Sequence, residues 1–185
     1  MFTMRAINLA IGASLFSVAT LASAATTVSG GTVHFTGQIV NAACAISADS
    51  MNQTINMGQF RTARFKAVGD RSGDVPFQIK LLDCDTSVST KASATFVGAA
   101  DATDTTVLSV SNISGGGAGS ASGLGIELTD SKGLVLTPNG VVFSTPATLT
   151  DGANVLNFNA RYKSTKASVL PGQADADATF KIKYE

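Results

Sequence analysis

Two cysteines are the residues of this sequence most capable of chemistry. Cys44 and Cys84 are its only cysteines, and neither belongs to a Cys-x-x-Cys motif. A redox or nucleophilic cysteine needs an activating neighbour, but the single histidine, His34, falls on the polar face of a predicted strand. An even cysteine count in an exported chain is typical of a disulfide. We therefore predict a structural Cys44–Cys84 bridge, whose loop of about 40 residues would stabilise the fold by roughly 4 kcal/mol in the chain-entropy model.

The remaining candidates for chemistry are weaker. A single histidine leaves no metal cluster of the usual His/Cys kind and no Ser–His–Asp set. Two aspartate pairs, Asp83 with Asp85 and Asp175 with Asp177, are typical of solvated surface rather than of acid–base catalysis. The glycine run 115–119 lacks the Gly-Lys-Ser/Thr of a phosphate-binding loop. The sequence thus predicts no enzyme, no catalytic residue, no metal and no cofactor.

The N-terminus has the pattern of a secretory signal. Arg5 precedes a mostly apolar segment, Ala6–Leu21, and Ala22-Ser23-Ala24 follows as a small-x-small cleavage site. We predict a signal peptide over residues 1–24, cleaved within one residue of that end. No later stretch approaches 18 apolar residues, and without Arg5 the net charge is 13 − 1 − 13 = −1. The chain is therefore expected to be exported, with no nucleic-acid partner and no membrane insertion.

The first predicted strand is Thr32–Val40. One face carries Val33, Phe35, Gly37 and Ile39, and His34, Thr36 and Gln38 lie between them. A glycine within a strand often marks a place where another chain segment approaches closely. This segment could be the first strand of an ordinary sandwich or a strand given to another molecule, and by itself it favours the former.

The rest of the chain is predicted to be a single all-β sandwich. Short alternating segments are separated by turn residues, and Ser111–Gly123 is a glycine-rich loop. The predicted strands are Gln53–Gly58, Val75–Leu82, Lys91–Val97, Thr106–Val110, Leu124–Thr129, Leu134–Leu136, Val141–Phe143 and Val155–Lys163.

The last predicted strand, Ala174–Tyr184, raises a pairing problem. Its apolar face comprises Ala174, Ala176, Ala178, Phe180, Ile182 and Tyr184. Both this face and the strand's backbone edge need covering, yet no later strand follows. Either the first strand folds back onto it or another molecule covers it.

These residues resemble those of the pilin subunits of chaperone–usher fimbriae, and most closely the major rod subunits of type 1 fimbriae. The resemblance covers the chain after the signal peptide. It is carried, in order, by Val-x-Phe-x-Gly-x-Ile (Val33–Ile39), Val40-Asn-Ala-Ala-Cys-Ala45, Leu82-Asp-Cys-Asp85, Ala160-Arg-Tyr162, Gly172, Ala174–Phe180 and the penultimate Tyr184.

This resemblance implies an incomplete immunoglobulin-like sandwich that lacks its final strand. A donor strand from a chaperone or a neighbouring subunit would complete it. Residues 25–42 would be the donor extension, with Val33, Phe35, Gly37 and Ile39 entering the neighbour's groove, and residues 43–185 the pilin domain. The acceptor groove and chaperone docking edge would comprise Gly172, Ala174, Ala176, Ala178, Phe180, Ile182 and Tyr184.

The resemblance also implies the function. We expect a structural subunit that polymerises into the rod of a surface fimbria used in adhesion. Its partners would be identical subunits, a periplasmic chaperone, an outer-membrane usher and tip or adaptor subunits. The alternatives are a minor tip or adaptor pilin, or a carbohydrate-binding adhesin. An adhesin of this family would need an extra N-terminal lectin domain, for which the roughly 20 residues expected between the signal peptide and Cys44 leave no room.

Overall fold

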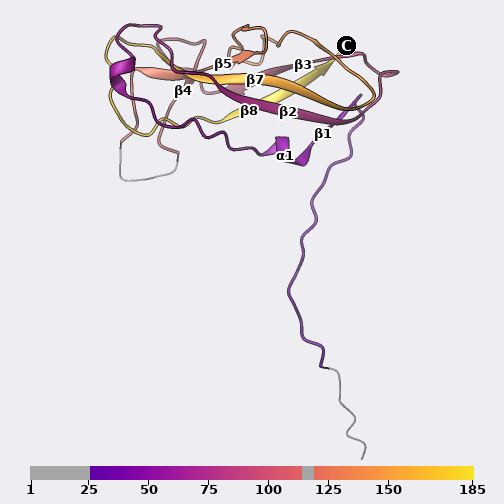
Figure 1. Ribbon diagram of the computed structural model, residues 1–185. Coiled ribbons are helices and arrows are strands. Elements are labelled where there is room, and N and C mark those ends of the chain that lie inside the picture. Colours follow the sequence, from indigo (N-terminus) through magenta and orange to yellow (C-terminus); the bar gives the residue numbers. More distant parts are fainter. Residues whose placement is uncertain (1–25, 114–118) are drawn as a thin grey trace, which may run out of the picture. The chain divides into compact units, whose positions relative to one another are not determined.

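The computed structural model describes residues 26–113 and 119–185, in which the chain divides into two units, one ending at Gln38 and one running from Ile39 to Glu185. The predicted signal peptide and most of the glycine run lie outside the described residues. Residues 26–41 contain no helix or strand. The second unit is a two-sheet β-sandwich (Figure 1).

The larger sheet has five antiparallel strands in the order β1-β2-β7-β5-β4. The strands are β1 (Ala45–Ile46), β2 (Val75–Cys84), β4 (Leu108–Ser109), β5 (Leu124–Asp130) and β7 (Gly152–Ser164). The smaller sheet has the order β6-β3-β8, with β3 (Lys91–Gly98), β6 (Ala147–Thr148) and β8 (Ala178–Tyr184). Between residues 26 and 113 and between 119 and 185, the helical segments are α1 (Ala48–Met51) and the 3-10 turn η1 (Thr62–Arg64). No helix within the described ranges is long and apolar enough to cross a membrane.

Alternating strand residues build the core between the two sheets. In β7, the predicted inward residues Leu156, Phe158, Ala160 and Tyr162 are all buried. Phe158 packs against Phe96 of β3, with ring centroids 5.3 Å apart, and Phe77 of β2 contacts both rings. These three aromatic side chains join the sheets, because each comes from a different strand and all point into the same layer.

The turns follow the predicted chemistry at one hairpin in particular. Asp130 ends β5, and its carboxylate accepts hydrogen bonds from the amides of Lys132 and Leu134. Gly133 has a φ of +83°, which a glycine adopts without strain. The amide of Leu136 then donates to the carbonyl of Leu128, so the predicted hairpin about 130–133 is confirmed.

Several predicted strands are wrong in extent or absent. Gln53–Gly58 and Val141–Phe143 form no strand, and Leu134–Leu136 is reduced to an isolated bridge between Val135 and Thr129. Thr106–Val110 shortens to β4, and the last strand begins at Ala178 rather than Ala174. Residues 141–143 still run beside β3, where Thr95 Oγ1 donates to the carbonyl of Val142. Alternation alone cannot create a strand, since a strand also needs a hydrogen-bonding partner along its length.

Candidate functional site

An open groove runs beside the outer edge of the last strand. β8 pairs with β3 along one edge, and within residues 26–113 and 119–185 no strand pairs with its other edge. The groove has a volume of about 1090 Å³. One wall is formed by residues 50–60, and the other by residues 169–178 and Phe180. The predicted strand Gln53–Gly58 is therefore a groove wall, and among the residues described no strand pairs with it.

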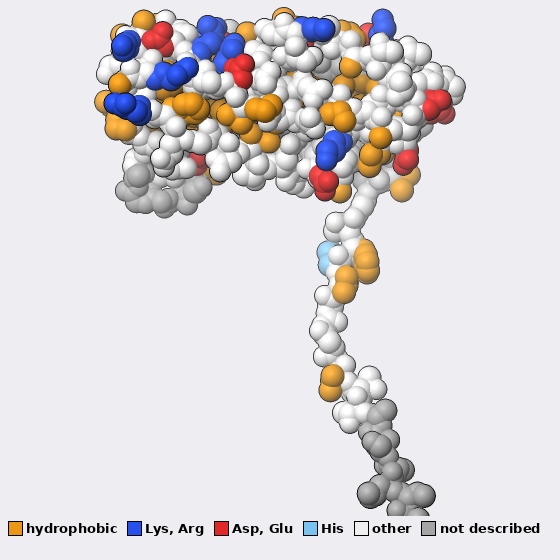
Figure 2. Space-filling view, viewed as in Figure 1, with side chains coloured by type: hydrophobic (Ala, Val, Ile, Leu, Met, Phe, Trp, Pro, Cys, Tyr) orange, Lys and Arg blue, Asp and Glu red, His pale blue; other side chains and the backbone are white. Residues whose placement is uncertain are grey.

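The floor of the groove is formed by side chains of the hydrophobic core. It is lined by Phe65, Phe77, Phe96, Leu108, Leu124, Ile126, Leu128, Ala160 and Tyr162. Hydrophobic side chains are visible at the surface across one face of the sandwich (Figure 2). An open apolar groove of this size beside an unpaired strand edge can accept an extended peptide, with backbone hydrogen bonds along β8 and apolar side chains on the floor.

Five of the seven predicted acceptor residues line this groove. They are Gly172, Ala174, Ala176, Ala178 and Phe180. Ile182 and Tyr184 continue the same face of β8 but lie beyond the groove, where they pack against the core. The Tyr184 hydroxyl donates a hydrogen bond of 3.2 Å to the carbonyl of Cys44, and burial raises the pKa of this phenol.

Gly172 holds one wall by close approach rather than by a special backbone angle. A β-carbon at this position would lie 2.4 Å from the carbonyl oxygen of Gly119 and 2.5 Å from the amide nitrogen of Ala121. The same wall is held against the core, because the Tyr162 hydroxyl donates a hydrogen bond of 2.8 Å to the carbonyl of Ala174. A larger residue at 172 would have to displace backbone, so this part of the groove requires glycine.

The predicted donor residues are exposed to solvent and pack against no core formed by the described residues. Val33 is 73% exposed, Phe35 87% and Ile39 100%. A β-carbon added at Gly37 would meet no atom within 4 Å. Three large apolar side chains on one face of an extended segment are thus left without a core of their own.

The two cysteines form the predicted disulfide, confirming that pairing. It joins the residue before β1 to the last residue of β2. Beside the disulfide, the backbone amide of Asp85 donates a hydrogen bond of 2.9 Å to the carbonyl of Ala43. The chain that continues from the extension is therefore anchored at this end of the sandwich.

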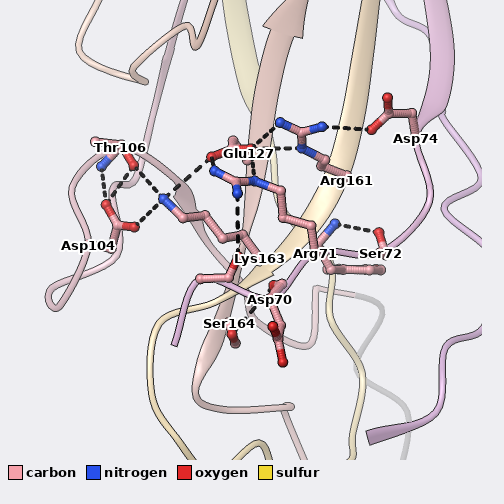
Figure 3. Close-up of polar contacts among 12 residues, drawn as sticks. Asp70, Arg71, Ser72, Asp74, Asp104, Thr106, Glu127, Arg161, Lys163 and Ser164 are labelled. Atoms are coloured by element: carbon pink, nitrogen blue, oxygen red, sulfur yellow. Dashed lines mark hydrogen bonds and ion pairs between the residues drawn. The ribbon is translucent and has the colours of Figure 1, made fainter. Parts of the chain in front are cut away.

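A charge network around one buried carboxylate, on the outer face of the larger sheet, was not predicted. Glu127 of β5 is fully buried, and its carboxylate accepts hydrogen bonds from Arg71 (2.8 Å) and Arg161 (2.7 Å), with Lys163 Nζ 3.4 Å away (Figure 3). Lys163 also pairs with Asp104 at 2.7 Å. In the sequence Glu127 looks like any surface acid on an alternating strand, so only the contacts across β5 and β7 reveal the network.

The network keeps its carboxylates ionised. Burial is the largest influence on the pKa of Glu127 and raises it, but hydrogen bonds from Arg71 and Arg161 together outweigh burial and lower the pKa to about 2. The pKa of Asp104 is likewise lowered to about 2, because the bonds from Lys163 and Thr106 exceed the cost of burial. These residues neutralise one another and hold the loop at 70–74 against β7, which is a structural role.

No group of three or more potential metal ligands occurs in the part of the chain that the structure describes. The arrangement of the site is that of a binding groove. What it can do is bind an extended apolar strand.

Comparison with known proteins identifies the family. Residues 33–185 match the family described as Fimbrial protein. The chain belongs to the fimbrial protein family. It is 49% identical over 177 residues to the fimbrial subunit type 1 of Salmonella typhimurium, covering 94% of this chain and 95% of that protein. It is 50% identical over 173 residues to the type-1 fimbrial protein A chain of Escherichia coli K12, covering 93% and 92% of the two chains.

Solved structures agree with this family and with the predicted fold. A chaperone–usher pilus subunit, solved in a study of rod uncoiling, superposes with a TM-score of 0.68 at 27% identity, covering 87% of this chain and all of that chain. The P pilus rod subunit PapA gives a TM-score of 0.64 at 26% identity, covering 78% and 100%. The all-β immunoglobulin-like prediction is confirmed, and this fimbrial protein is a structural subunit.

Proposed function

We propose that this fimbrial subunit polymerises by donor-strand exchange into the rod of a surface fimbria that serves adhesion. The observation that carries the proposal is the open groove beside β8, combined with an extension whose apolar face is uncovered. In each joint, Val33, Phe35, Gly37 and Ile39 of one subunit enter the groove of the next. The donor backbone takes the place of the missing strand beside β8.

The energetics favour a long-lived joint. Burying Val33, Phe35 and Ile39 contributes roughly 1.5–3 kcal/mol for each side chain. Backbone hydrogen bonds to β8 add to this, and the joint covers an exposed sheet edge. Such a joint dissociates slowly, which suits a fibre assembled outside the cell without an energy source.

The same groove explains the need for assembly partners. A subunit with an open apolar groove is prone to aggregate, so a periplasmic chaperone would fill the groove first and use the face of β8 through Ile182 and Tyr184. An outer-membrane usher would then allow the donor strand of the next subunit to replace it. Removal of residues 1–24, export through the periplasm and attachment to tip or adaptor subunits belong to the same proposal.

The proposal is tested by a matched pair of glycine variants in the extension. Gly37→Val adds a side chain to the donor face, whereas Gly30→Val adds the same side chain outside it. An added β-carbon meets no atom within 4 Å at either position, so neither change affects folding of the free subunit. We expect Gly37→Val to abolish the polymer and Gly30→Val to leave it intact.

The readout is a gel of sheared surface material in SDS, with unheated and boiled samples side by side. A ladder that collapses to monomer only on boiling identifies a non-covalent strand-exchanged polymer. Normal ladders from Gly37→Val, or from Phe35→Asp, would overturn the donor assignment. The rod assignment also requires this chain to be the main component of the sheared fibres, since a minor tip or adaptor subunit would be scarce.

A further inference from the structure

The two ends of the sandwich can be identified from β7, which spans its whole length. At its first residue, Gly152 pairs with Cys84, and at its last residue Ser164 pairs with Leu124. We call these the disulfide end and the Ser164 end. β8 runs toward the disulfide end, because Ala178 pairs with Gly98 while Glu185 exchanges backbone hydrogen bonds with Lys91.

Exposed cations gather at the Ser164 end, beside the groove. Arg61, Arg64 and Lys66 alternate with the groove-lining residues Thr62 and Phe65. Their segment lies against the end of β7, where Ser164 Oγ donates to the carbonyl of Ala67. Lys166 lies two residues beyond Ser164. Figure 2 shows Lys and Arg side chains concentrated toward this end of the sandwich.

Two acids near these cations accept hydrogen bonds from neighbouring groups. The Asp70 carboxylate accepts hydrogen bonds from the amides of Lys66 and Ala67. Asp175, on the other wall of the groove, accepts one from Gln173. Asp177 on the same wall also lines the groove and is exposed. Four exposed cations, Arg61, Arg64, Lys66 and Lys166, outnumber these three acids at the mouth of the groove. We call these four residues the cationic rim.

The disulfide end has the opposite charge. Asp83 and Asp85 flank Cys84, and Asp151 precedes Gly152, its pairing partner. All three are exposed. The cations nearby are Lys91 and Lys183, of which Lys183 pairs with Glu185. We call Asp83, Asp85 and Asp151 the acidic end.

We propose that the cationic rim of one subunit docks against the acidic end of the next copy of this chain at each joint of the fibre. The inference rests on the proposed donor-strand exchange and adds a second contact to it. Its geometric basis is the short connection between the donor residues and the acidic end. Only Val40, Asn41 and Ala42 separate Ile39 from Ala43. The carbonyl of Ala43 accepts a hydrogen bond from the backbone amide of Asp85 at the acidic end. Four extended residues span at most about 14 Å, so the acidic end must lie close to the bound Ile39.

The charges also select the direction of the donor strand. A donor strand antiparallel to β8 ends at the Ser164 end of the acceptor subunit. This direction places the acidic end of the donor's own subunit against the cationic rim of the acceptor. A parallel donor would end at the disulfide end of the acceptor and would bring two acidic ends together. Complementary rim charges mainly raise the rate of productive encounter and select orientation, and they contribute less to final affinity.

The test uses charge reversal at each end and a charge swap in one chain. The variants are Arg61→Glu/Lys66→Glu at the cationic rim, Asp83→Lys/Asp85→Lys at the acidic end, and all four changes together. Lys132→Glu, in the exposed turn after β5, is the matched control. Polymer growth of the oxidised full subunit is followed on unheated SDS gels at low and high ionic strength.

We expect each single-end reversal to slow elongation about tenfold at low ionic strength and less at high ionic strength. The variant with all four changes restores opposite charges across every joint, and it should recover most of the elongation rate. The Lys132→Glu control should elongate as the unmodified chain does. Reversals without effect, or a swap that is no better than the single-end reversals, would overturn the proposal.

A peptide of residues 26–42 separates this inference from the proposed function. If the peptide stops elongation of every variant, donor-strand binding is supported. The elongation rates of the charge variants then test only the docking of the cationic rim against the acidic end. If unmodified subunits form no polymer and ignore the peptide, the proposed function fails and this inference fails with it.

Discussion

The Tyr184 hydroxyl in β8 donates a hydrogen bond to the carbonyl of Cys44, 140 residues earlier in the chain. The bond ties the end of β8 to a cysteine of the disulfide. We expect Tyr184→Phe to lower the free energy of unfolding by about 1 kcal/mol, because the ring still packs but one hydrogen bond is lost. Equilibrium unfolding in urea measures this. An unchanged midpoint and slope would show that the bond contributes nothing.

Loss of the disulfide should be far more costly. Cys44→Ser/Cys84→Ser removes the bridge without leaving a free thiol, and we expect the free energy of unfolding to fall by about 4 kcal/mol, since the bridge closes a long loop. Urea unfolding of the double variant beside the oxidised parent gives the difference. Equal stability of the two proteins would contradict this.

Gly172→Ala should distort the groove wall. The new methyl group would lie 2.4 Å from the carbonyl oxygen of Gly119, so backbone must shift, at a cost of about 1–3 kcal/mol. The control is Gly73→Ala, where an added β-carbon meets no atom within 4 Å and stability should change by less than about 0.5 kcal/mol. Binding of the 26–42 peptide should weaken in the first variant only. Equal effects of the two substitutions would argue against the close approach at Gly172.

Acid should weaken the fold through Glu127. Its pKa is lowered from 4.5 to about 2 in the folded state, so its ionised form contributes stability that is complete above about pH 4.5. That contribution is lost as the pH falls from about 4.5 to about 2. Glu127→Gln should lower the free energy of unfolding by about 3 kcal/mol at neutral pH, because it removes the buried negative charge that pairs with Arg71 and Arg161. The difference from the parent should narrow as the pH falls through this window.

Unfolding curves at several pH values between 2 and 7 measure this effect. The matched control is Asp49→Asn on the exposed surface of α1, a carboxylate-to-amide change that should alter stability little. If Glu127→Gln shows the same loss at every pH in this window, ionisation of Glu127 is not the cause.

Local patterns in the sequence determined the class of fold, the disulfide and much of the core. The alternation of Leu156, Phe158, Ala160 and Tyr162 predicted the buried face of β7, and the Asp130–Gly133 turn predicted a hairpin. These features follow from the two-residue period of a strand and from turn chemistry, both of which act between near neighbours. The family motifs are equally local, and they predicted the donor and acceptor segments by resemblance.

Only the tertiary structure decided which alternating segments become strands and which close contacts they make. Gln53–Gly58 alternates but forms a groove wall, because a strand needs a partner and no strand pairs with this segment in the part of the chain that the structure describes. Glu127 is joined by Arg71 and Arg161, which lie 56 and 34 residues away along the chain. Only glycine fits at position 172, because the backbone of residues 119–121 approaches it closely. The residues next to Gly172 in the sequence do not reveal this contact. Such contacts depend on how the strands are ordered in the sheets, which alternation along one segment cannot specify.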